Sequence, residues 1–399
     1  MRVAIVHDWL TGMRGGERVL EAMLDLFPDA EIFALLHVPG SVSPRIEARP
    51  IHTSPLQRAT FVRRRYRRWL PLFPLAVEAL DPRGFDLVLS SSHCVAKAVR
   101  PRGAPHLCYC HTPMRYAWDQ LDAYLPPGAA GRLARTLAVP AAAALRRWDA
   151  ATVGRVDAFV ANSAHVRGRI RRCWGRDAAV VHPPVAVERF RRPRAPEDFY
   201  LVLGALVPYK RVELAIRAAA LAGRRLVVAG DGPELPRLRA LAGPGVTFLG
   251  RVSDDDVADL YARCRAFLFP GVEDFGIAAV EAQAAGAPVV ARAAGGALET
   301  VAAAPEPTGV FFAEPSPEAR AAAMRRLEAA PPREAACRAS AERFATPRFH
   351  EGLSREIERL LGTTAARPAL AASPPVPVEA RPAAAETRPG PSGTHARSA

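Results

Sequence analysis

Three carboxylates in the second half of the chain have types and spacing suited to binding a polar ligand. Glu273 and Asp274 follow a short apolar run at 266–269, and Glu281 comes eight residues after Glu273. The apolar run predicts a buried strand, and 275–285 has the spacing of a helix. The first two acids therefore lie just ahead of a helix N-terminus, where free N–H groups favour anionic or hydroxyl-rich ligands.

The spacing of these acids argues against a shared proton. If most of the interval is helical, Glu273 and Glu281 lie on the order of 10 Å apart, which suits contacts with two parts of one long ligand. The alternative is that both are exposed acids with no ligand. Glu281 stands among alanines and Val280, where a charge is costly unless it is paired or ligand-bound.

The motifs of this stretch resemble the signature of retaining nucleotide-sugar glycosyltransferases of family four. They are Glu273-Asp-Phe-Gly-Ile with Glu281, then Gly286-x-Pro288-Val-Val and Gly295-Gly296. The resemblance implies a GT-B fold of class α/β, in which two Rossmann-like domains face each other across a cleft. It also implies site roles: Glu273 is catalytic, Glu281 binds the ribose, and the donor sugar meets Asp274, Phe275 and Gly276.

The composition of the chain agrees with an enzyme that binds phosphates. The 399 residues are enough for two complete domains, and 49 % of them are hydrophobic. The formal net charge of +14 favours an anionic partner, which could be a nucleotide, an acidic membrane surface or nucleic acid. The apolar run 3–6 is too short for a signal peptide, and no uncharged apolar run has membrane-spanning length. We expect a cytoplasmic protein.

The cysteines indicate neither disulfides nor a metal centre. The six cysteines do not have the regular spacing of a disulfide framework, which favours a reducing compartment. Cys108, Cys110 and His111 together suggest a metal site. No second pair of ligands has zinc spacing, however, and alternation along a strand explains both cysteines. We expect no metal and no cofactor, with the nucleotide-sugar acting as a substrate.

Two loops of the first half are candidates for the same cleft. Gly15 and Gly16 lie between a buried strand and an amphipathic helix, an arrangement that can cradle phosphate. His111 follows the strand 106–109, and ligands of open α/β sheets bind at such strand ends. An ordinary turn and a structural histidine are the alternatives. The resemblance implies that Gly15 and Gly16 close over the donor diphosphate and that His111 contacts the donor sugar.

Cations begin a helix in the second half. Lys210 and Arg211 oppose the helix dipole unless an anion lies between them, and a diphosphate is such an anion. The resemblance assigns both to the donor diphosphate and places Val252 beside the base. The family usually has an arginine about five residues before the lysine, where this chain has Ala205. The phosphate contacts here are then weaker or are completed by Arg211.

The periodicity predicts alternating strands and helices in each half of the chain. Strands are expected at 3–6, 86–91, 106–109, 158–161, 178–181, 200–206, 226–229, 246–249, 266–269, 288–292 and 309–313. Helices are expected at 17–27, from about 93, at 131–153 with a break at Pro140, at 164–174, after 211, after a capping box at Ser253-x-x-Asp256 as far as 264, and at 275–285, 316–329, 332–345 and 349–361.

These elements divide the chain into four parts. Residues 1–185 form an acceptor-side domain and residues 186–345 a donor domain. The helix at 346–362 crosses back to the first domain, and 363–399 is a disordered tail rich in Ala and Pro. The segment 57–75 mixes six arginines with aromatic residues. It resembles a membrane-surface segment, and a solvated basic face is the alternative.

The resemblance implies transfer of a sugar with retention of anomeric configuration. Within the family, the chain resembles the bacterial mannosyltransferases of O-antigen and exopolysaccharide synthesis. This resemblance suggests GDP-mannose as the donor and a saccharide or lipid-linked saccharide as the acceptor. A sugar-nucleotide epimerase or phosphorylase of the same fold is one alternative. A non-enzymatic basic protein that binds membrane or nucleic acid is another, although it leaves the acidic stretch unexplained and no nucleic-acid motif is present.

Overall fold

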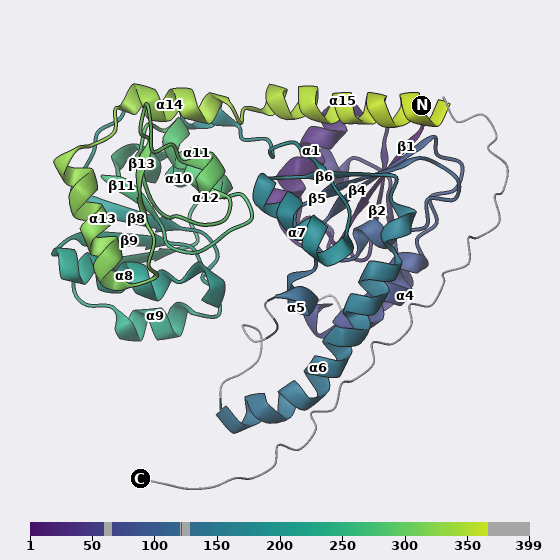
Figure 1. The fold of residues 1–399 in the computed structure, drawn as a ribbon, viewed down its shortest axis with the longest axis horizontal. Helices are drawn as coiled ribbons and strands as arrows, with labels where there is room; N and C mark the ends of the chain where they lie inside the picture. Colours follow the sequence, from purple (N-terminus) through teal and green to yellow (C-terminus); the bar gives the residue numbers. More distant parts are fainter. Residues whose placement is uncertain (60–65, 120, 122–127, 366–399) are drawn as a thin grey trace, which may run out of the picture.

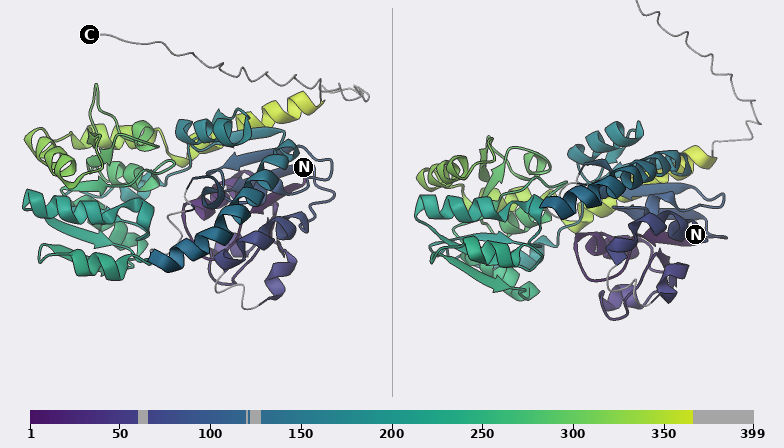
Figure 2. Two further views of the ribbon diagram at one scale, coloured as in Figure 1. Left: turned by 60° about the horizontal axis from the view of Figure 1, so that its bottom comes forward. Right: turned by 90° about the horizontal axis from the view of Figure 1, so that it is seen from below.

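The computed structural model describes residues 1–59, 66–119, 121 and 128–365. Two parallel sheets covered by helices form two lobes, which lie side by side in every view (Figures 1 and 2). We call the lobe built on the first sheet the first lobe and the other the second lobe.

The first sheet has seven parallel strands in the order β3-β2-β1-β4-β5-β6-β7. Every residue of its inner strands β1, β4 and β5 is buried, as expected where helices cover both faces. The strands are β1 Val3–His7, β2 Glu31–Ala34, β3 Ile51–Thr53, β4 Leu87–Ser92, β5 His106–Cys110, β6 Ala158–Ala161 and β7 Ala179–Val180. Its helices are α1 Gly15–Leu26, α2 Pro44–Glu47, α4 Phe73–Glu78, α5 Arg115–Trp118, α6 Gly128–Ala151 and α7 Ala164–Trp174.

The second sheet has six parallel strands in the order β10-β9-β8-β11-β12-β13. The strands are β8 Phe199–Leu203, β9 Arg225–Ala229, β10 Val246–Gly250, β11 Ala266–Phe269, β12 Val289–Arg292 and β13 Gly309–Phe312. Its helices are α8 Val212–Ala222, α9 Leu235–Leu241, α10 Asp254–Arg263, α11 Ile277–Ala284, α12 Ala297–Thr300, α13 Pro317–Ala329 and α14 Glu334–Glu342. The capping box of α10 is confirmed, since Ser253 Oγ accepts the Asp256 N–H at 3.1 Å.

The last helix, α15 (Thr346–Ala365), leaves the second lobe and runs along the first (Figure 1). Phe349, Leu353, Ile357 and Leu360 are spaced as one helix face and are buried in the core of the first sheet. Apolar burial of this kind contributes about 1.5–3 kcal/mol for each fully buried large side chain. The two lobes are therefore connected twice, through the chain after β7 and through α15.

The helix expected from about His93 is wrong. The structure has only the 3-10 turn Ala96–Ala98 there. The buried Asp8 carboxylate accepts the N–H groups of residues 93–96 at 2.6–2.9 Å, which orders the turn. Pro101 follows closely and disfavours helical backbone in the residue before it, so no helix grows from this start.

The expected break of the long helix at Pro140 is also wrong, because α6 continues through that residue. The alanines at 141–144 are strong helix formers and offset the lost hydrogen bond. Residues 60–65 of the basic segment and 366–399 of the predicted tail lie outside the described residues. Within the described part, no helix combines the length and apolar character needed to cross a membrane.

We predict that Asp8→Ala destabilises the first lobe by about 3 kcal/mol or more, because four buried N–H groups lose their acceptor. All five tryptophans precede residue 175, so urea unfolding followed by tryptophan fluorescence reports on this lobe. Asp81→Ala is the control, since its partners Arg83 and Arg102 are solvent-exposed and such pairs contribute about 1 kcal/mol or less. Equal losses in the two variants would contradict this role of Asp8.

Candidate active site between the lobes

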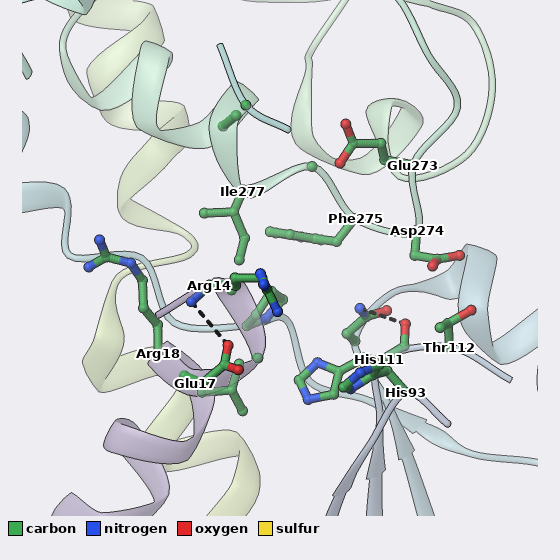
Figure 3. Close-up of a pocket in the computed structure, with 18 of the residues that line it drawn as sticks. Arg14, Glu17, Arg18, His93, His111, Thr112, Glu273, Asp274, Phe275 and Ile277 are labelled. Carbon is green, nitrogen blue, oxygen red and sulfur yellow. Dashed lines mark hydrogen bonds between the residues drawn. The ribbon is translucent and has the colours of Figure 1, made fainter. Parts of the chain in front are cut away.

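A cavity of about 610 Å³ lies between the two lobes and is lined by side chains from both. Figure 3 shows the start of α1 and the ends of first-sheet strands facing the loop before α11. The cavity brings together most of the site residues predicted from the sequence. They are Gly15, Gly16, His111, Lys210, Glu273, Asp274, Phe275, Gly276 and Glu281. Strand ends of two open α/β sheets thus face one space, which is where such sheets bind ligands.

Glu273 and Lys210 form an ion pair at the second-lobe side of the cavity. Glu273 Oε1 lies 3.0 Å from Lys210 Nζ, and both side chains are about one-fifth exposed. Burial alone would lower the pKa of Lys210, but the Glu273 carboxylate raises it above its ordinary value. A cation and a carboxylate are therefore ready for a ligand that has both negative charge and hydroxyl groups.

Glu281 is a nearly unpartnered acid on α11. Among the described residues, its hydrogen-bond partner is the Tyr261 hydroxyl, which donates to Oε2 at 3.4 Å. Burial raises the pKa of Glu281, and the more distant Arg18 and Arg189 only partly offset that effect. A desolvated carboxylate gains from hydrogen-bond donors, so this side chain is suited to a hydroxyl pair.

The Asp274 carboxylate, which the resemblance assigns to the donor sugar, binds side chains of the first lobe. It accepts hydrogen bonds from Arg115 and, at 2.8 Å, from Arg169 Nη1. Asp274 is 7 % exposed and Arg169 is 3 % exposed. Burial alone would raise the pKa of Asp274, but the two guanidiniums lower it below its ordinary value. The Asp274 carboxylate thus joins the lobes, while its loop still lines the cavity.

Two further acids of the second lobe contact the first lobe. The Glu299 carboxylate accepts the backbone N–H groups of Ala164 and His165 at 2.8 and 3.1 Å, and so caps α7 from the other lobe. Asp254 pairs with Arg18 of α1 at 3.1 Å. Together with Asp274, these contacts fix how the two walls of the cavity face each other.

His111 lines the cavity from the end of β5. Burial lowers its pKa to about 3, with a further contribution from the neighbouring His93 and His7 rings. The ring is therefore neutral near pH 7. Asn162 Nδ2 donates to the His111 carbonyl at 3.0 Å and holds the backbone of this loop (Figure 3). A neutral imidazole can donate through one nitrogen and accept through the other.

Glycine is required where the loops approach each other. Gly276 has φ +100, and a Cβ there would lie 2.7 Å from the Phe269 ring. A Cβ on Gly15 would lie 3.0 Å from Ile277 Cδ1, across the cavity. The glycines of α1 therefore allow its N-terminus to meet the N-terminus of α11, which concentrates free N–H groups at one place.

Two predicted site residues do not line the cavity. Arg211 has φ +53 and directs its Nε to Glu213 Oε1 at 2.6 Å. The two neighbouring cations therefore have different partners, Glu213 for Arg211 and Glu273 for Lys210. Val252 packs against the core of the second sheet. The predicted diphosphate and base contacts of these two residues gain no support from this geometry.

Sequence reasoning assigned no role to two arginines that line the cavity, Arg14 and Arg18. Arg14 and Arg18 lie at the N-terminus of α1. The argument used for Lys210, that cations oppose the dipole of a helix start unless an anion is present, applies equally to these two residues. Arg115 also lines the cavity, as its place after the strand 106–109 indicates, but its partner Asp274 is 159 residues away in the sequence and was not foreseen.

Comparison with known families agrees with this architecture. The family described as Glycosyltransferase Family 4 matches residues 13–189, and Glycosyl transferases group 1 matches 187–344. The chain belongs to the family-four glycosyltransferases of GT-B fold.

Curated members of these families match part of the chain. A D-inositol 3-phosphate glycosyltransferase of Streptomyces scabiei is 32 % identical over 179 residues, which cover 36 % of this chain and 40 % of the relative. A GDP-mannose-dependent alpha-mannosyltransferase of Mycolicibacterium smegmatis is 36 % identical over 148 residues, covering 35 % of this chain and 38 % of the relative. The chain therefore spans about two-fifths of the length of the curated relatives it matches.

Solved structures match almost the whole chain. HepE of Anabaena in complex with UDP has a TM-score of 0.66 at 16 % identity and covers 90 % of this chain and 100 % of its own. The lipopolysaccharide outer core galactosyltransferase WaaB has a TM-score of 0.63 at 16 % identity and covers 90 % and 99 %. At this identity the likeness shows the fold alone, and it is the GT-B fold expected from the sequence.

We predict that Asp274→Asn lowers the free energy of unfolding by about 3–5 kcal/mol at pH 6, because it leaves buried arginine charge uncompensated. The depressed pKa of Asp274 fixes the sign of the pH dependence. Its stabilisation is complete above the unfolded-state pKa and is lost as the pH falls through the folded-state pKa. The difference between wild type and variant should then narrow below about pH 4.

Asp119→Asn is the matched control for this prediction, to be measured by urea unfolding at several pH values. Asp119 pairs with the same Arg169 but its side chain is 47 % exposed, so a loss of about 1 kcal/mol or less is expected. A loss at Asp274 no larger than at Asp119 would show that the contact between the lobes contributes little.

Proposed function

We propose that the protein is a retaining glycosyltransferase that moves a sugar from a nucleoside diphosphate donor to a hydroxyl acceptor. The observation that carries this is the Lys210–Glu273 ion pair in the cavity between the lobes. A nucleotide-sugar has a diphosphate for the cation and sugar hydroxyls for the carboxylate, joined by one bond. Membership of the glycosyltransferase families supports the same conclusion.

The proposed donor extends along the second lobe. The diphosphate lies between Lys210 and the N–H groups at Gly15 and Gly16, and the sugar hydroxyls meet Glu273 and the amides of Phe275 and Gly276. Glu281 accepts hydrogen bonds from the ribose. Arg14 lines the same cavity and supplies positive charge from the first lobe. This charge takes the place of the arginine that the family usually has on the second lobe, where this chain has Ala205.

In the proposed reaction, the bond between the anomeric carbon and the diphosphate oxygen breaks, and that oxygen keeps the electron pair. The acceptor oxygen attacks the anomeric carbon from the face that the diphosphate leaves, and its proton passes to the departing phosphate. Lys210, Arg14 and the loop amides stabilise the negative charge that grows on the diphosphate. His111 is neutral and contacts the donor sugar. The proposal assigns no step to a metal ion.

For the substrates, we propose GDP-mannose as the donor and a saccharide or lipid-linked saccharide of surface polysaccharide synthesis as the acceptor. The support is the name of the GDP-mannose-dependent relative. HepE was solved with UDP, so a uridine donor is the alternative that a binding comparison distinguishes.

We further propose that the protein works in the cytoplasm at the inner face of the membrane. Leu72 and Leu75 at the end of the basic segment are 38 % and 71 % exposed, and a lipid-linked acceptor would lie at that surface. Exposed leucines next to arginines suit an anionic membrane interface.

We predict that Lys210→Ala weakens binding of GDP, or of the preferred nucleoside diphosphate, about 10- to 100-fold in titration calorimetry, the loss of one charge-assisted contact. Arg211→Ala is a matched control. It removes a positive charge one residue later, from a side chain that pairs with Glu213 and does not line the cavity. It should change the dissociation constant less than about threefold. A larger loss in Arg211→Ala would reverse the assignment.

We predict that Glu273→Gln lowers kcat/KM for sugar transfer about 100-fold, because the side chain loses a charge that orients the donor sugar. The assay follows labelled mannose from GDP-mannose into lipid-linked saccharides extracted from bacterial membranes. Glu318→Gln, an exposed acid on α13, should leave the rate unchanged. Full turnover by Glu273→Gln would remove this residue from the site.

A further inference from the structure

A hydroxyl group at the end of β4 links the buried His7 to the partly buried His111. Ser91 Oγ lies 3.1 Å from His7 Nδ1 and 2.8 Å from His111 Nε2. The other nitrogen of His7, Nε2, faces Glu17 Oε1 at 3.8 Å and hydrogen-bonds to none of the described residues. A row of polar groups therefore runs from Glu17 on α1, through His7 and Ser91, to the ring that lines the cavity, with hydrogen bonds between His7, Ser91 and His111 and a charge contact at its Glu17 end.

The direction of the hydrogen bonds along this path follows from its acidic end. His7 is fully buried and Glu17 is 3 % exposed. Burial raises the pKa of Glu17, but His7 lowers it below the ordinary value, so the carboxylate is an acceptor. With one proton on the His7 ring, that proton lies on Nε2, where it faces the carboxylate. His7 Nδ1 is then an acceptor, and it receives the hydrogen of the Ser91 hydroxyl.

Ser91 has a single hydrogen to donate, so its oxygen can only accept from His111. That requires the hydrogen of His111 to be on Nε2. His111 Nδ1 then carries a lone pair. This nitrogen makes no hydrogen bond to any described residue, and the ring lines the cavity. The opposite direction, in which Ser91 donates to His111, would need the proton of His7 on Nδ1 and would leave the lone pair of Nε2 facing the Glu17 carboxylate.

We propose that Glu17, His7 and Ser91 are positioning residues that hold His111 in its Nε2–H tautomer, so that Nδ1 accepts a hydrogen bond from a hydroxyl of the donor sugar. The contact with the sugar rests on the proposed function. The tautomer does not, because it follows from contacts within the protein. A ring held this way favours a donor sugar that presents a hydroxyl group, and so a hydrogen, to His111 Nδ1.

The same strand supplies an internal reference. His106, also on β5, places Nδ1 2.8 Å from the Arg155 carbonyl and Nε2 2.8 Å from Ser90 Oγ. A carbonyl only accepts, so the hydrogen of His106 must be on Nδ1. His106 and His111 should therefore be opposite tautomers, and each contacts a serine of β4.

The test is nitrogen-15 NMR of the full-length protein with labelled histidine, in which protonated and lone-pair nitrogens of a neutral ring have well-separated shifts. His111→Asn identifies the signals of that residue by their loss. The wild-type spectrum should show His111 as Nε2–H and His106 as Nδ1–H. His111 found as Nδ1–H, or with both nitrogens protonated, would overturn the proposal without any variant.

The variants test whether the path causes the tautomer. Ser91→Ala and, separately, Glu17→Gln should convert His111 to a mixture of both tautomers. Ser90→Ala is the matched control, because it removes the neighbouring hydroxyl of β4 and should leave His111 as pure Nε2–H. A pure Nε2–H state of His111 in both Ser91→Ala and Glu17→Gln would contradict the role of the path. Circular dichroism verifies that each variant is folded.

A second readout separates this inference from the proposed function. In the transfer assay, Ser91→Ala should lower kcat about five- to tenfold, the effect of losing one hydrogen bond, with KM for the donor changed less than about twofold. If the wild type shows the expected tautomers of His111 and His106 but transfers no sugar, the proposed function fails and the role of Glu17, His7 and Ser91 stands. Sugar transfer with tautomers unaffected by both variants would mean the reverse.

Discussion

The buried contact of Asp274 with Arg115 and Arg169 is the constraint on which the rest of the site depends. It joins a loop of the second lobe to two elements of the first, and it is inaccessible to solvent screening. Breaking the contact would leave the charges of Asp274, Arg115 and Arg169 without this pairing, which is costly in a buried position. The contact therefore holds the lobes in one relative position as long as the Asp274 carboxylate is ionised. The cavity, whose walls come from different lobes, exists because of that position.

This arrangement also determines what a ligand has to replace. In the ligand-free protein, Lys210 and Glu273 neutralise each other, whereas Glu281 has only a long hydrogen bond to Tyr261. A ligand with an anionic centre and hydroxyl groups on both sides can satisfy all three at once. A simple anion cannot, because it would leave the carboxylates without donors. The geometry thus favours a nucleotide-sugar over free phosphate, and our proposal adds one more sugar contact, from His111 at the first-lobe wall.

Much of the fold could be predicted because its signals are local. The buried strands are apolar runs, and Ser253 and Gly286 mark helix ends through their own chemistry. The strands β2 and β3 were missed because they are short and include polar residues. The turn after His93 was mistaken for a helix because its order comes from Asp8, which is distant in sequence. Local patterns do not carry that information.

The candidate site divides in the same way. Glu273, Glu281 and Lys210 were found from helix starts and apolar surroundings, which are visible in the sequence. The partners of Asp274 were not, because an ion pair between residues 115 and 274 is specified only by the folded chain. Arg211 was assigned to the diphosphate from its position beside Lys210, whereas a single positive φ sends the two side chains to different partners.

The most direct test of the account is thermal stabilisation of the protein by GDP, UDP, ADP, NAD and a short oligonucleotide, with Glu281→Ala measured beside the wild type. A ligand at one hundred times its dissociation constant adds about 2.7 kcal/mol, which is readily seen as a rise in Tm. The account predicts that one nucleoside diphosphate raises Tm in the wild type and much less in Glu281→Ala. No rise with any nucleotide, or a rise with the oligonucleotide alone, would contradict it.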